Sequence, residues 1–254
     1  VRIEMFAHGA LCMAVSGKCY LSLQTYGASA NRGACYQLCR RGYEVTDLET
    51  GTKLNIDNKY IMSPKDLCTI EFMDKIIDAG VKVFKIEGRA RSAEYVKKTA
   101  ECYRRAADAV CEGRYTPELA AALKEELSEV FNRGFWDGYY QGARLGEWSD
   151  VYGSHATRKK IYCGKITNWF DRISVAEVLV ESETLRKGDD ILIIGETTGV
   201  IEQTVSELRV DLKPTDKAGK GTLCSIPVIF PDDIRTPGRK KIRRGDKVYI
   251  WREI

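Results

Sequence analysis

Residues 4–19 read E-M-F-A-H-G-A-L-C-M-A-V-S-G-K-C, and residues 35–39 read C-Y-Q-L-C. These two stretches place four cysteines within 28 residues at a spacing of C-x6-C-x15-C-x3-C, whereas the other five cysteines of the chain stand alone. Four thiolates that converge on one point can hold an iron–sulfur cluster or a structural zinc ion. The four are Cys12, Cys19, Cys35 and Cys39.

The spacing alone leaves the role of this cysteine cluster open. Zinc ligands are typically about two to four residues apart, and only the pair Cys35 and Cys39 fits that range. The spacing also departs from the common ferredoxin patterns. Inert thiols that only pack in a core, or a redox pair, are the alternatives. We expect metal ligation, with iron–sulfur, zinc and no metal as the possible outcomes.

The residues around these cysteines resemble a known family, the collagenase-like peptidases of unknown catalytic type (peptidase family U thirty-two). The resemblance rests on E-x-F-x-H-G-A-L-C-x-x-x-S-G-x-C, on F-K-I-E-G-R at residues 84–89 and on F-N-R-G-F at residues 131–135. The last hundred or so residues are also similar to that family's terminal barrel. The likeness therefore covers nearly the whole chain.

The resemblance implies RNA modification, in spite of the family's name. Characterised members are hydroxylation proteins that act on tRNA, rRNA or quinone precursors. In those members four matching cysteines hold a [4Fe–4S] cluster, and prephenate is implicated as an oxygen source. For this chain the resemblance implies the same cluster at its four cysteines, prephenate as a possible co-substrate, and hydroxylation of a pyrimidine in tRNA or rRNA.

Length and composition indicate a protein with proper cores and no membrane span. The 254 residues, 44% hydrophobic and 30% charged, suit one large or two medium domains. No apolar run approaches the length of a membrane-spanning helix, and no signal peptide precedes the first strand. Because nine cysteines occur without a secretory signal, we expect a reducing cytoplasm and no membrane partner.

The first residues alternate like a strand already under way, and Val1 is not an initiator methionine. The family resemblance places roughly the first half of a parallel α/β barrel upstream of this point. We therefore expect a C-terminal fragment or one piece of a split protein. The open sheet edges would be completed by the missing chain, a partner chain or a homodimer.

The first half of the chain is predicted to form the C-terminal part of a (β/α) TIM-like barrel, over residues 1–130. Alternation predicts a strand at residues 1–7 that ends at His8-Gly9, which places His8 and Cys12 on one rim of the barrel. The remaining elements are a hairpin insert at 42–62, a helical turn that opens at Ser63-Pro64, a helix at 70–79, a buried strand at 81–87, and helices at 93–110 and 117–130.

Residues 131–158 are predicted to be a connecting segment, and residues 159–254 a small β-barrel. From Lys159 the apolar period switches to two, as in short strands. The sequence L-R-K-G-D-D-I-L-I at 185–193 repeats as I-R-R-G-D-K-V-Y-I at 242–250, which predicts two equivalent turns of one closed barrel. The arrangement resembles the second domain of translation elongation factors.

Charged side chains at the end of the strand at 81–87 are candidates for the substrate site. Lys85, Glu87 and Arg89 alternate, so they share one face and could project into a barrel interior. We assign anion binding to Lys85, Arg89 and Arg91, and catalytic roles to His8 and Glu87. The alternative is a structural layer of ion pairs.

A peptidase site has little support in the sequence. The chain has two histidines and neither an H-E-x-x-H nor a G-x-S-x-G motif. Cys12 and His8 could mimic a cysteine-peptidase pair, but nearness in sequence does not orient a dyad. The rival functions are a true peptidase and a non-catalytic RNA-binding module.

The net charge lies entirely in the C-terminal part. Residues 1–154 carry 21 basic and 21 acidic side chains, whereas residues 155–254 carry 19 and 15. Two basic runs there could bind the phosphates of tRNA or rRNA, or could be solvated turns. The candidate RNA-binding residues are Lys159, Lys160, Arg239, Lys240, Lys241, Arg243 and Arg244.

Overall fold

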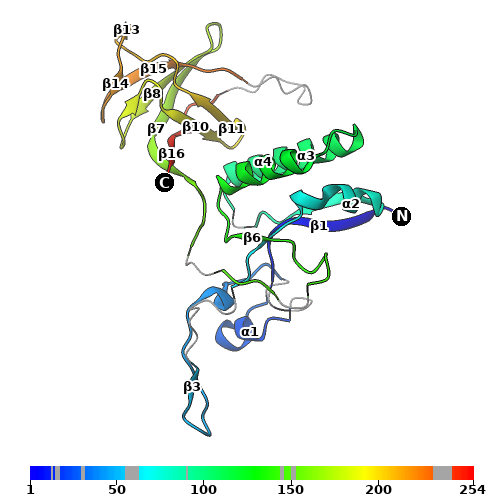
Figure 1. Ribbon diagram of the computed structural model, residues 1–254. Coiled ribbons are helices and arrows are strands. Elements are labelled where there is room, and N and C mark those ends of the chain that lie inside the picture. The colour runs from blue at the N-terminus through cyan, green and yellow to red at the C-terminus, as the bar shows by residue number, and fades with distance from the viewer. Residues whose placement is uncertain are drawn as a thin grey trace. The chain divides into compact units, whose positions relative to one another are not determined.

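The computed structural model describes residues 1–12, 14, 18–29, 32–54, 63–89, 91–143, 146–149, 153–230 and 242–254. It divides into two compact units (Figure 1). The first unit comprises Val1–Arg91 and Lys98–Ala156, and the second comprises Ser92–Lys97 and Thr157–Ile254. In the described ranges, no helix is long and apolar enough to cross a membrane.

The first unit is built on a four-stranded mixed sheet in the order β5-β1-β4-β6. Its strands are β1 (Ile3–Ala10), β4 (Asp66–Cys68), β5 (Val81–Ile86) and β6 (Phe135–Trp136). β1 runs parallel to β5 but antiparallel to β4, and β4 runs parallel to β6. The expected α/β class is therefore confirmed, whereas this mixed sheet does not confirm a TIM-like barrel, whose strands would all be parallel.

The first strand is longer than its sequence predicts. β1 continues through His8 and Gly9 because β4 pairs with this end of it, with His8 opposite Cys68. His8 is buried and lies two residues before the end of β1 at Ala10, and its place on one rim with Cys12 stays a prediction. Gly9 is required here: its φ is +118°, and an added Cβ would lie 2.6 Å from the carbonyl oxygen of Glu87.

The helical turn predicted at Ser63-Pro64 is also wrong. Pro64 forms an isolated β-bridge with Trp148, and β4 follows it directly. The backbone N–H of Asp66 donates to the carbonyl of Gly134 at 2.9 Å, and that of Lys65 donates to the carbonyl of Glu147 at 3.0 Å. Partners this distant in sequence override the local preference of a Ser-Pro pair for a helix start.

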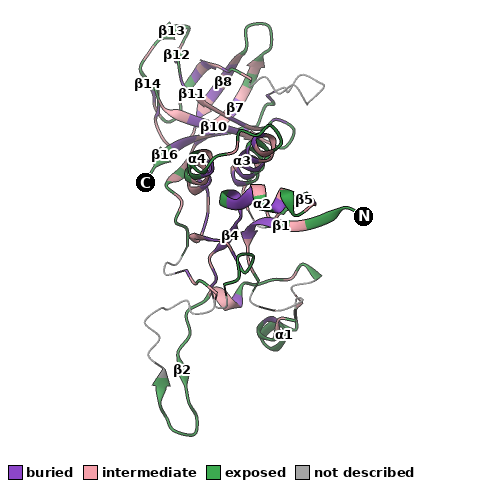
Figure 2. Cartoon of the chain, turned by 45° about the vertical axis from the view of Figure 1, so that its right-hand side comes forward, coloured by how far each residue is buried: buried purple, intermediate pink, exposed green. Residues whose placement is uncertain are grey.

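The hairpin predicted at 42–62 is confirmed as far as residue 54. Val45–Thr46 (β2) pairs with Lys53–Leu54 (β3), and Gly51 between them has a φ of +69°. Residues 55–62 lie outside the described residues. The hairpin extends away from the sheet of its unit and is exposed (Figures 1 and 2).

The predicted helices are found where their apolar periodicity places them. A 3-10 turn at Ile70–Phe72 leads into α2 (Met73–Asp78), and α3 (Ala93–Cys111) and α4 (Pro117–Ser128) follow; a short helix, α1 (Tyr20–Tyr26), comes earlier. Thr116 caps α4, because its Oγ1 accepts a hydrogen bond from the N–H of Leu119 at 3.2 Å. β1, β4 and the helices share a buried core that includes Ile70, Met73, Tyr103, Leu123 and Leu127.

The second unit contains an eight-stranded sheet in the order β11-β10-β16-β7-β8-β15-β12-β13. Its strands are β7 (Arg158–Phe170), β8 (Val175–Val180), β10 (Asp190–Gly195), β11 (Gly199–Thr204), β12 (Arg209–Val210), β13 (Lys213–Pro214), β15 (Leu223–Pro227) and β16 (Lys247–Glu253). β9 (Leu185–Arg186) and β14 (Lys217–Ala218) form a separate pair. Among the described strands β11 and β13 end the sheet, so a closed barrel is not confirmed.

The repeated sequence of the second unit forms the same turn twice. In the first copy the N–H of Arg186 donates to Asp189 Oδ2 at 2.8 Å, and in the second the N–H of Arg243 donates to Asp246 Oδ2 at 2.8 Å. The glycines that follow the basic pairs have φ values of +90° and +94°. The strands that begin after the two turns, β10 and β16, pair antiparallel.

Candidate functional site

A single buried carboxylate organises the polar interior of the first unit. Asp66, on β4, is 1% exposed, and both of its oxygens face guanidinium groups. Arg91 Nη2 lies 3.1 Å from Oδ2, and Arg133 Nη1 lies 3.5 Å from Oδ1. The two arginine side chains are themselves only 7% and 11% exposed. These two ion pairs connect three segments of the chain: Arg91 follows β5, Asp66 is on β4, and Arg133 precedes β6.

A third arginine extends this group, which we call the arginine cluster: Arg40, Arg91 and Arg133 with Asp66. Arg40 donates to the Oγ of Ser63 and the carbonyl of Pro64, both at 3.1 Å, and to the carbonyl of Leu11 at 3.0 Å. These three acceptors are neutral groups. Burial, followed by repulsion from Arg40, lowers the pKa of Arg133 to about 10.

An aromatic ring completes the arginine cluster. The guanidinium carbons of Arg91 and Arg133 lie 4.2 and 4.9 Å from the centre of the Phe131 ring. A ring face attracts cations, and this contact gains strength when water is excluded. Arg91 and Arg133 pair with Asp66, and the charge of Arg40 acts on Arg133, so this largely buried site is an electropositive environment suited to an anion.

His8 lies near this positive charge and is neutral at neutral pH. Burial, followed by the nearby charge of Arg91, lowers its pKa to about 3. Its Nδ1 lies 3.3 Å from the hydroxyl of Tyr103, and its ring contacts Phe135 at 5.6 Å between centres. A neutral imidazole here can donate or accept one hydrogen bond at each nitrogen but does not supply a positive charge.

Tyr103, on α3, ties this histidine to the rest of the sheet. Its hydroxyl donates to the carbonyl of Ala7 at 2.8 Å and accepts from the N–H of Thr69 at 2.9 Å. Burial raises the pKa of Tyr103 well above the usual tyrosine range, so the group stays protonated. The hydroxyl therefore fixes β1 and the end of β4 at the position where His8 is held.

The other candidates from the F-K-I-E-G-R stretch do not face an interior. Lys85 is exposed, lies 3.3 Å from the carboxylate of Glu4 and sits over the ring of Phe6. Arg89 is exposed, and its N–H donates to Glu87 Oε1 at 2.6 Å. Lys85 and Arg89 are exposed and Glu87 is half-buried, so the expected projection of these three side chains into a barrel interior is not confirmed. Of the predicted anion-binding residues, only Arg91 is in the arginine cluster.

The four clustered cysteines are free thiols in one neighbourhood. Cys12 and Cys35 are exposed, whereas Cys19 and Cys39 are half-buried. Burial raises the pKa of Cys39, and the other three cysteines raise it further, while Arg40 opposes them. A hydrogen bond with Ser22 lowers the pKa of Cys19, which caps α1.

Four free thiols are the ligand set that an iron–sulfur cluster requires. They also lie in one region, because the charges of the other three raise the pKa of Cys39. Among the residues with described positions, however, no three His, Cys, Asp or Glu side chains are grouped closely enough to hold a metal ion. Ligation by Cys12, Cys19, Cys35 and Cys39 therefore stays a prediction. Of the remaining cysteines, Cys111 is exposed, and burial raises the pKa of Cys68 to about 11.

The candidate RNA-binding residues fall in different settings. Lys159 is exposed, whereas Lys160 pairs with Glu94 at 2.9 Å. Arg243 and Arg244 are exposed at the second copy of the repeated turn. The other candidates, Arg239, Lys240 and Lys241, lie outside the described residues.

Sequence reasoning missed three residues of the arginine cluster. Arg133 lies within F-N-R-G-F, a stretch that carries the family resemblance, and Arg40 directly follows Cys39, the last of the four clustered cysteines. Asp66 had no such signal, because its strand is not evident from local sequence. An arginine inside a glycine-bounded motif was the signal that could have identified Arg133.

The chain belongs to peptidase family U32: the model described as Peptidase family U32 matches residues 1–150. The chain is 58% identical over 249 residues to a protein named "Collagenase" from Porphyromonas gingivalis (strain ATCC BAA-308 / W83), covering 98% of this chain and 58% of that protein. It thus spans little more than half of that relative's length.

Two other relatives carry names from RNA modification. The chain is 32% identical over 200 residues to tRNA hydroxylation protein P1 of Bacillus subtilis (strain 168), covering 77% of this chain and 47% of that protein. It is 40% identical over 151 residues to a 23S rRNA 5-hydroxycytidine synthase of Escherichia coli (strain K12), covering 57% of this chain and 23% of that protein.

Proposed function

We propose that this chain is part of an iron–sulfur enzyme that hydroxylates a pyrimidine in tRNA or rRNA, and that the arginine cluster binds its anionic co-substrate. The observation that carries the proposal is the pair of largely buried guanidiniums of Arg91 and Arg133 on Asp66, with the charge of Arg40 acting on Arg133 and a neutral histidine nearby. The hydroxylation names of two relatives support the reaction class.

The co-substrate that this site suits is a small carboxylate such as prephenate. Arginine binds carboxylates through two parallel N–H donors, and the bond is strongest where water is excluded. Arg91 and Arg133 would hold the anion, while Asp66 keeps their side chains in place. His8 would position substrate through a hydrogen bond, and Glu87, at the end of β5, is the second catalytic candidate.

We further propose that Cys12, Cys19, Cys35 and Cys39 hold a [4Fe–4S] cluster, with zinc as the alternative. A bound cluster would supply one-electron chemistry or fix the surrounding loops. All nine cysteines are free thiols, which supports a reducing cytoplasm. β5 ends the described sheet, and the rest of the protein, a partner chain or a second copy would cover its open side.

The co-substrate proposal is tested by Arg133→Gln in the complete protein, with Arg105→Gln as the matched control. Arg105 pairs with Glu126 at the surface of the same unit. We expect prephenate to raise the Tm of the wild type and of Arg105→Gln but not of Arg133→Gln. Mass spectrometry of RNA nucleosides from cells that carry each variant should show hydroxylation lost only in Arg133→Gln. Equal prephenate stabilisation of both variants would exclude the arginine cluster as its site.

The cluster is tested by anaerobic iron and sulfide measurements on serine variants of the four cysteines. Each change should reduce the iron content, whereas Cys102→Ser and Cys163→Ser, at buried packing positions, should not. Equal iron loss at all six positions would indicate a folding effect. Zinc in place of iron would favour a structural site.

RNA binding is tested at the two copies of the repeated turn. Arg243→Gln with Arg244→Gln removes two exposed charges, and Arg186→Gln with Lys187→Gln removes two from the equivalent turn. If Arg243 and Arg244 contact phosphates, the slope of log affinity against log salt should fall by about 1.4–1.8 only in the first pair. If this slope is the same in both variants, the two copies of the repeated turn are solvated and do not bind phosphate.

A collagenase-like peptidase is the second candidate, because the 58% identical relative is named "Collagenase". The thiol paired with His8 across the sheet does not support a cysteine nucleophile, since burial raises the pKa of Cys68 to about 11. Gelatin hydrolysis that survives serine replacement of all four clustered cysteines would favour this candidate.

A further inference from the structure

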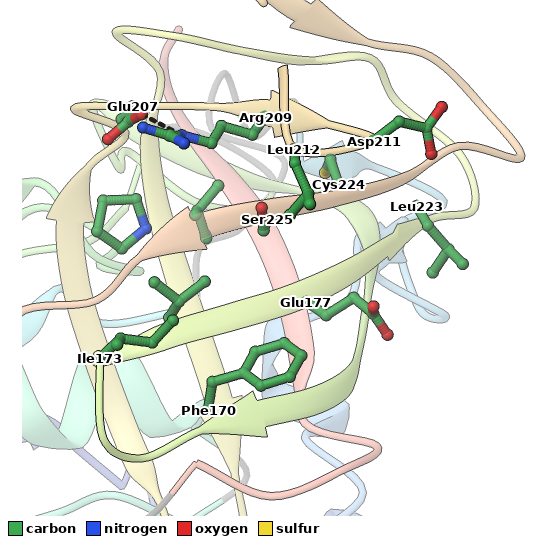
Figure 3. A pocket seen from close by; sticks show the side chains of 13 residues that line it. Phe170, Ile173, Glu177, Glu207, Arg209, Asp211, Leu212, Leu223, Cys224 and Ser225 are labelled. Carbon is green, nitrogen blue, oxygen red and sulfur yellow. Dashed lines mark hydrogen bonds and ion pairs between the residues drawn. The ribbon is translucent and has the colours of Figure 1, made fainter. Parts of the chain in front are cut away.

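A groove of about 530 Å³ lies on the second unit, and it includes no residue of the site proposed above. It runs over the outer face of β8, β15 and β12 (Figure 3). Phe170 and Ile173, from the end of β7 and its turn, stand on one side of the groove, and Leu212, from the β12–β13 turn, stands opposite them.

The groove is apolar although it lies on the outer face of the sheet, where polar side chains are expected. Along β8 the residues Ala176, Val178 and Val180 are buried in the core, so Val175 and Glu177 point outward. Along β15 the outward positions are Leu223, Ser225 and Pro227. With the apolar walls, these positions form a contiguous apolar surface, and surfaces of this kind on monomers commonly bind partners.

The wall formed by Leu212 is held in an unfavourable conformation. Asp211 and Leu212 both have positive φ values, +49° and +65°, in the tight turn between β12 and β13. Such turns favour glycine or asparagine, and leucine is disfavoured there. This leucine is nevertheless 84% exposed at the mouth of the groove, so it contributes little to folding. Strain at an exposed residue is found most often at functional positions.

The rim of the groove is acidic. Glu177, Glu207 and Asp211 line it together with one cation, Arg209, which is paired with Glu207. Glu177 accepts a hydrogen bond from the hydroxyl of Thr167 at 2.6 Å, and within the described ranges neither it nor Asp211 has a cationic partner. An apolar floor with an acidic rim repels phosphates and attracts a lysine or arginine.

The neighbouring sheet edge does not suit the addition of a strand. β13, which ends the sheet, consists of Lys213 and Pro214 only. A short edge with lysine and proline is a common means of blocking edge pairing. An occupant would therefore bind through side chains inserted into the groove rather than through backbone pairing.

We infer that this groove is a docking site for a protein segment that inserts an apolar side chain flanked by lysine or arginine. The apolar walls would bury the inserted side chain, and Glu177 and Asp211 would pair with the flanking cations. The pairing of an apolar anchor with a charged rim is typical of transient protein interfaces.

The test is a selection from a displayed library of random short peptides on the full protein, followed by anisotropy measurements with the selected peptides. We expect enriched peptides to carry a leucine or an aromatic residue next to lysine or arginine. Leu212→Asn, in which asparagine suits the turn, should weaken their binding about tenfold, the loss typical of one apolar anchor. Leu48→Asn, at an exposed leucine of the other unit, is the control and should have no effect.

The charge argument is tested separately by Glu177→Gln with Asp211→Asn, which should weaken the same peptides and reduce the salt dependence of binding. Thermal unfolding shows whether each variant folds. The proposal would be overturned if the selected peptides were acidic, or if the wild type enriched no more peptides than Leu212→Asn. It would also be overturned if the wild type and the groove variants bound the peptides with equal affinity. An RNA oligonucleotide that loses affinity in Leu212→Asn, or a dimer of the protein that this change dissociates, would overturn it as well.

Discussion

The two units of this chain depart from the usual distribution of side chains in opposite ways. The first unit places charged groups inside, where Arg91, Arg133 and Asp66 are almost fully buried. The second places apolar groups outside, where Leu212 and Ile173 project from the ends of hairpins. Each departure reduces stability unless something binds there, because buried charge loses hydration and exposed apolar surface remains in water.

The comparison indicates what each unit is suited to bind. In the two proposals above, the electropositive interior of the first unit binds an anion, whereas the surface of the second binds an apolar group and a cation. Natural sequences violate the local folding rules mainly at functional sites, where the loss of stability is tolerated. Substitutions at single residues in each unit measure that loss.

The largest expected effect is that of Asp66→Asn, which removes the carboxylate from the arginine cluster. Breaking a buried ion pair typically costs about 3–5 kcal/mol, because the remaining charge has no compensation. We expect a loss of that order in the free energy of unfolding, measured with urea. The control is Glu147→Gln, whose partnership with Lys65 at 2.7 Å is partly exposed and should contribute less than about 1 kcal/mol.

The result also tests whether the cluster lacks an anion. If Asp66→Asn is destabilised as expected, sulfate or prephenate should restore part of the stability of the variant by binding the uncompensated guanidiniums. A loss no larger than that of Glu147→Gln would mean that the interior of the first unit is not electrostatically demanding, and the contrast between the units would fail.

The next effect is a loss of stability in acid that depends on His8. Burial lowers its folded-state pKa to about 3, whereas the unfolded value is near 6.5. Between these values the unfolded chain binds more protons, so stability is fully present above pH 6.5 and falls as the pH decreases. From pH 6.5 to 5 the loss should be about 2 kcal/mol.

Urea unfolding at several pH values measures this dependence. His8→Gln should flatten the curve between pH 5 and 6.5. The exposed His155, changed in the same way, should leave it in place. The same slope in wild type and His8→Gln would assign the acid sensitivity to other groups.

A smaller loss is expected for Tyr103→Phe, which removes a hydroxyl that bonds two strands. The carbonyl of Ala7 and the N–H of Thr69 would each lose one hydrogen bond in a buried site but would keep the bond between them, at 3.1 Å. Because a typical internal hydrogen bond contributes about 0.5–1.5 kcal/mol, we expect a loss of that order. Tyr20→Phe, at an exposed tyrosine, should change the free energy of unfolding by less than about 0.5 kcal/mol. Equal small changes would show that water replaces the hydroxyl.

The sequence predicts the parts of this molecule that local chemistry determines. α3 and α4 follow from their apolar periodicity, and the two Gly-Asp turns follow from an internal repeat. β4 could not be predicted, since its partners are His8 in β1 and Gly134 in a distant loop. The arginine cluster has the same limitation, because Arg133 meets Asp66, and Arg40 comes near Arg133, only through the fold. The interior position expected for Lys85 is not confirmed, because alternation assigns a side chain to a face but does not determine what covers that face.

The smallest expected effect, and the one of opposite sign, is at Leu212. An L-amino acid in the left-handed region costs roughly 1–2 kcal/mol, whereas the additional chain entropy of glycine in the unfolded state offsets about half of that. Leu212→Gly should therefore raise the free energy of unfolding by roughly 0.5–1 kcal/mol while it weakens binding of the selected basic–apolar peptides. Leu223→Ser, on the floor of the same groove and within a strand, serves as the control, because it should weaken the peptides without any gain in stability. Urea unfolding and peptide anisotropy on the same samples measure both quantities. A gain in stability with unchanged peptide affinity would mean that the strained leucine has no part in binding, and the exposed apolar surface of the second unit would need a different occupant.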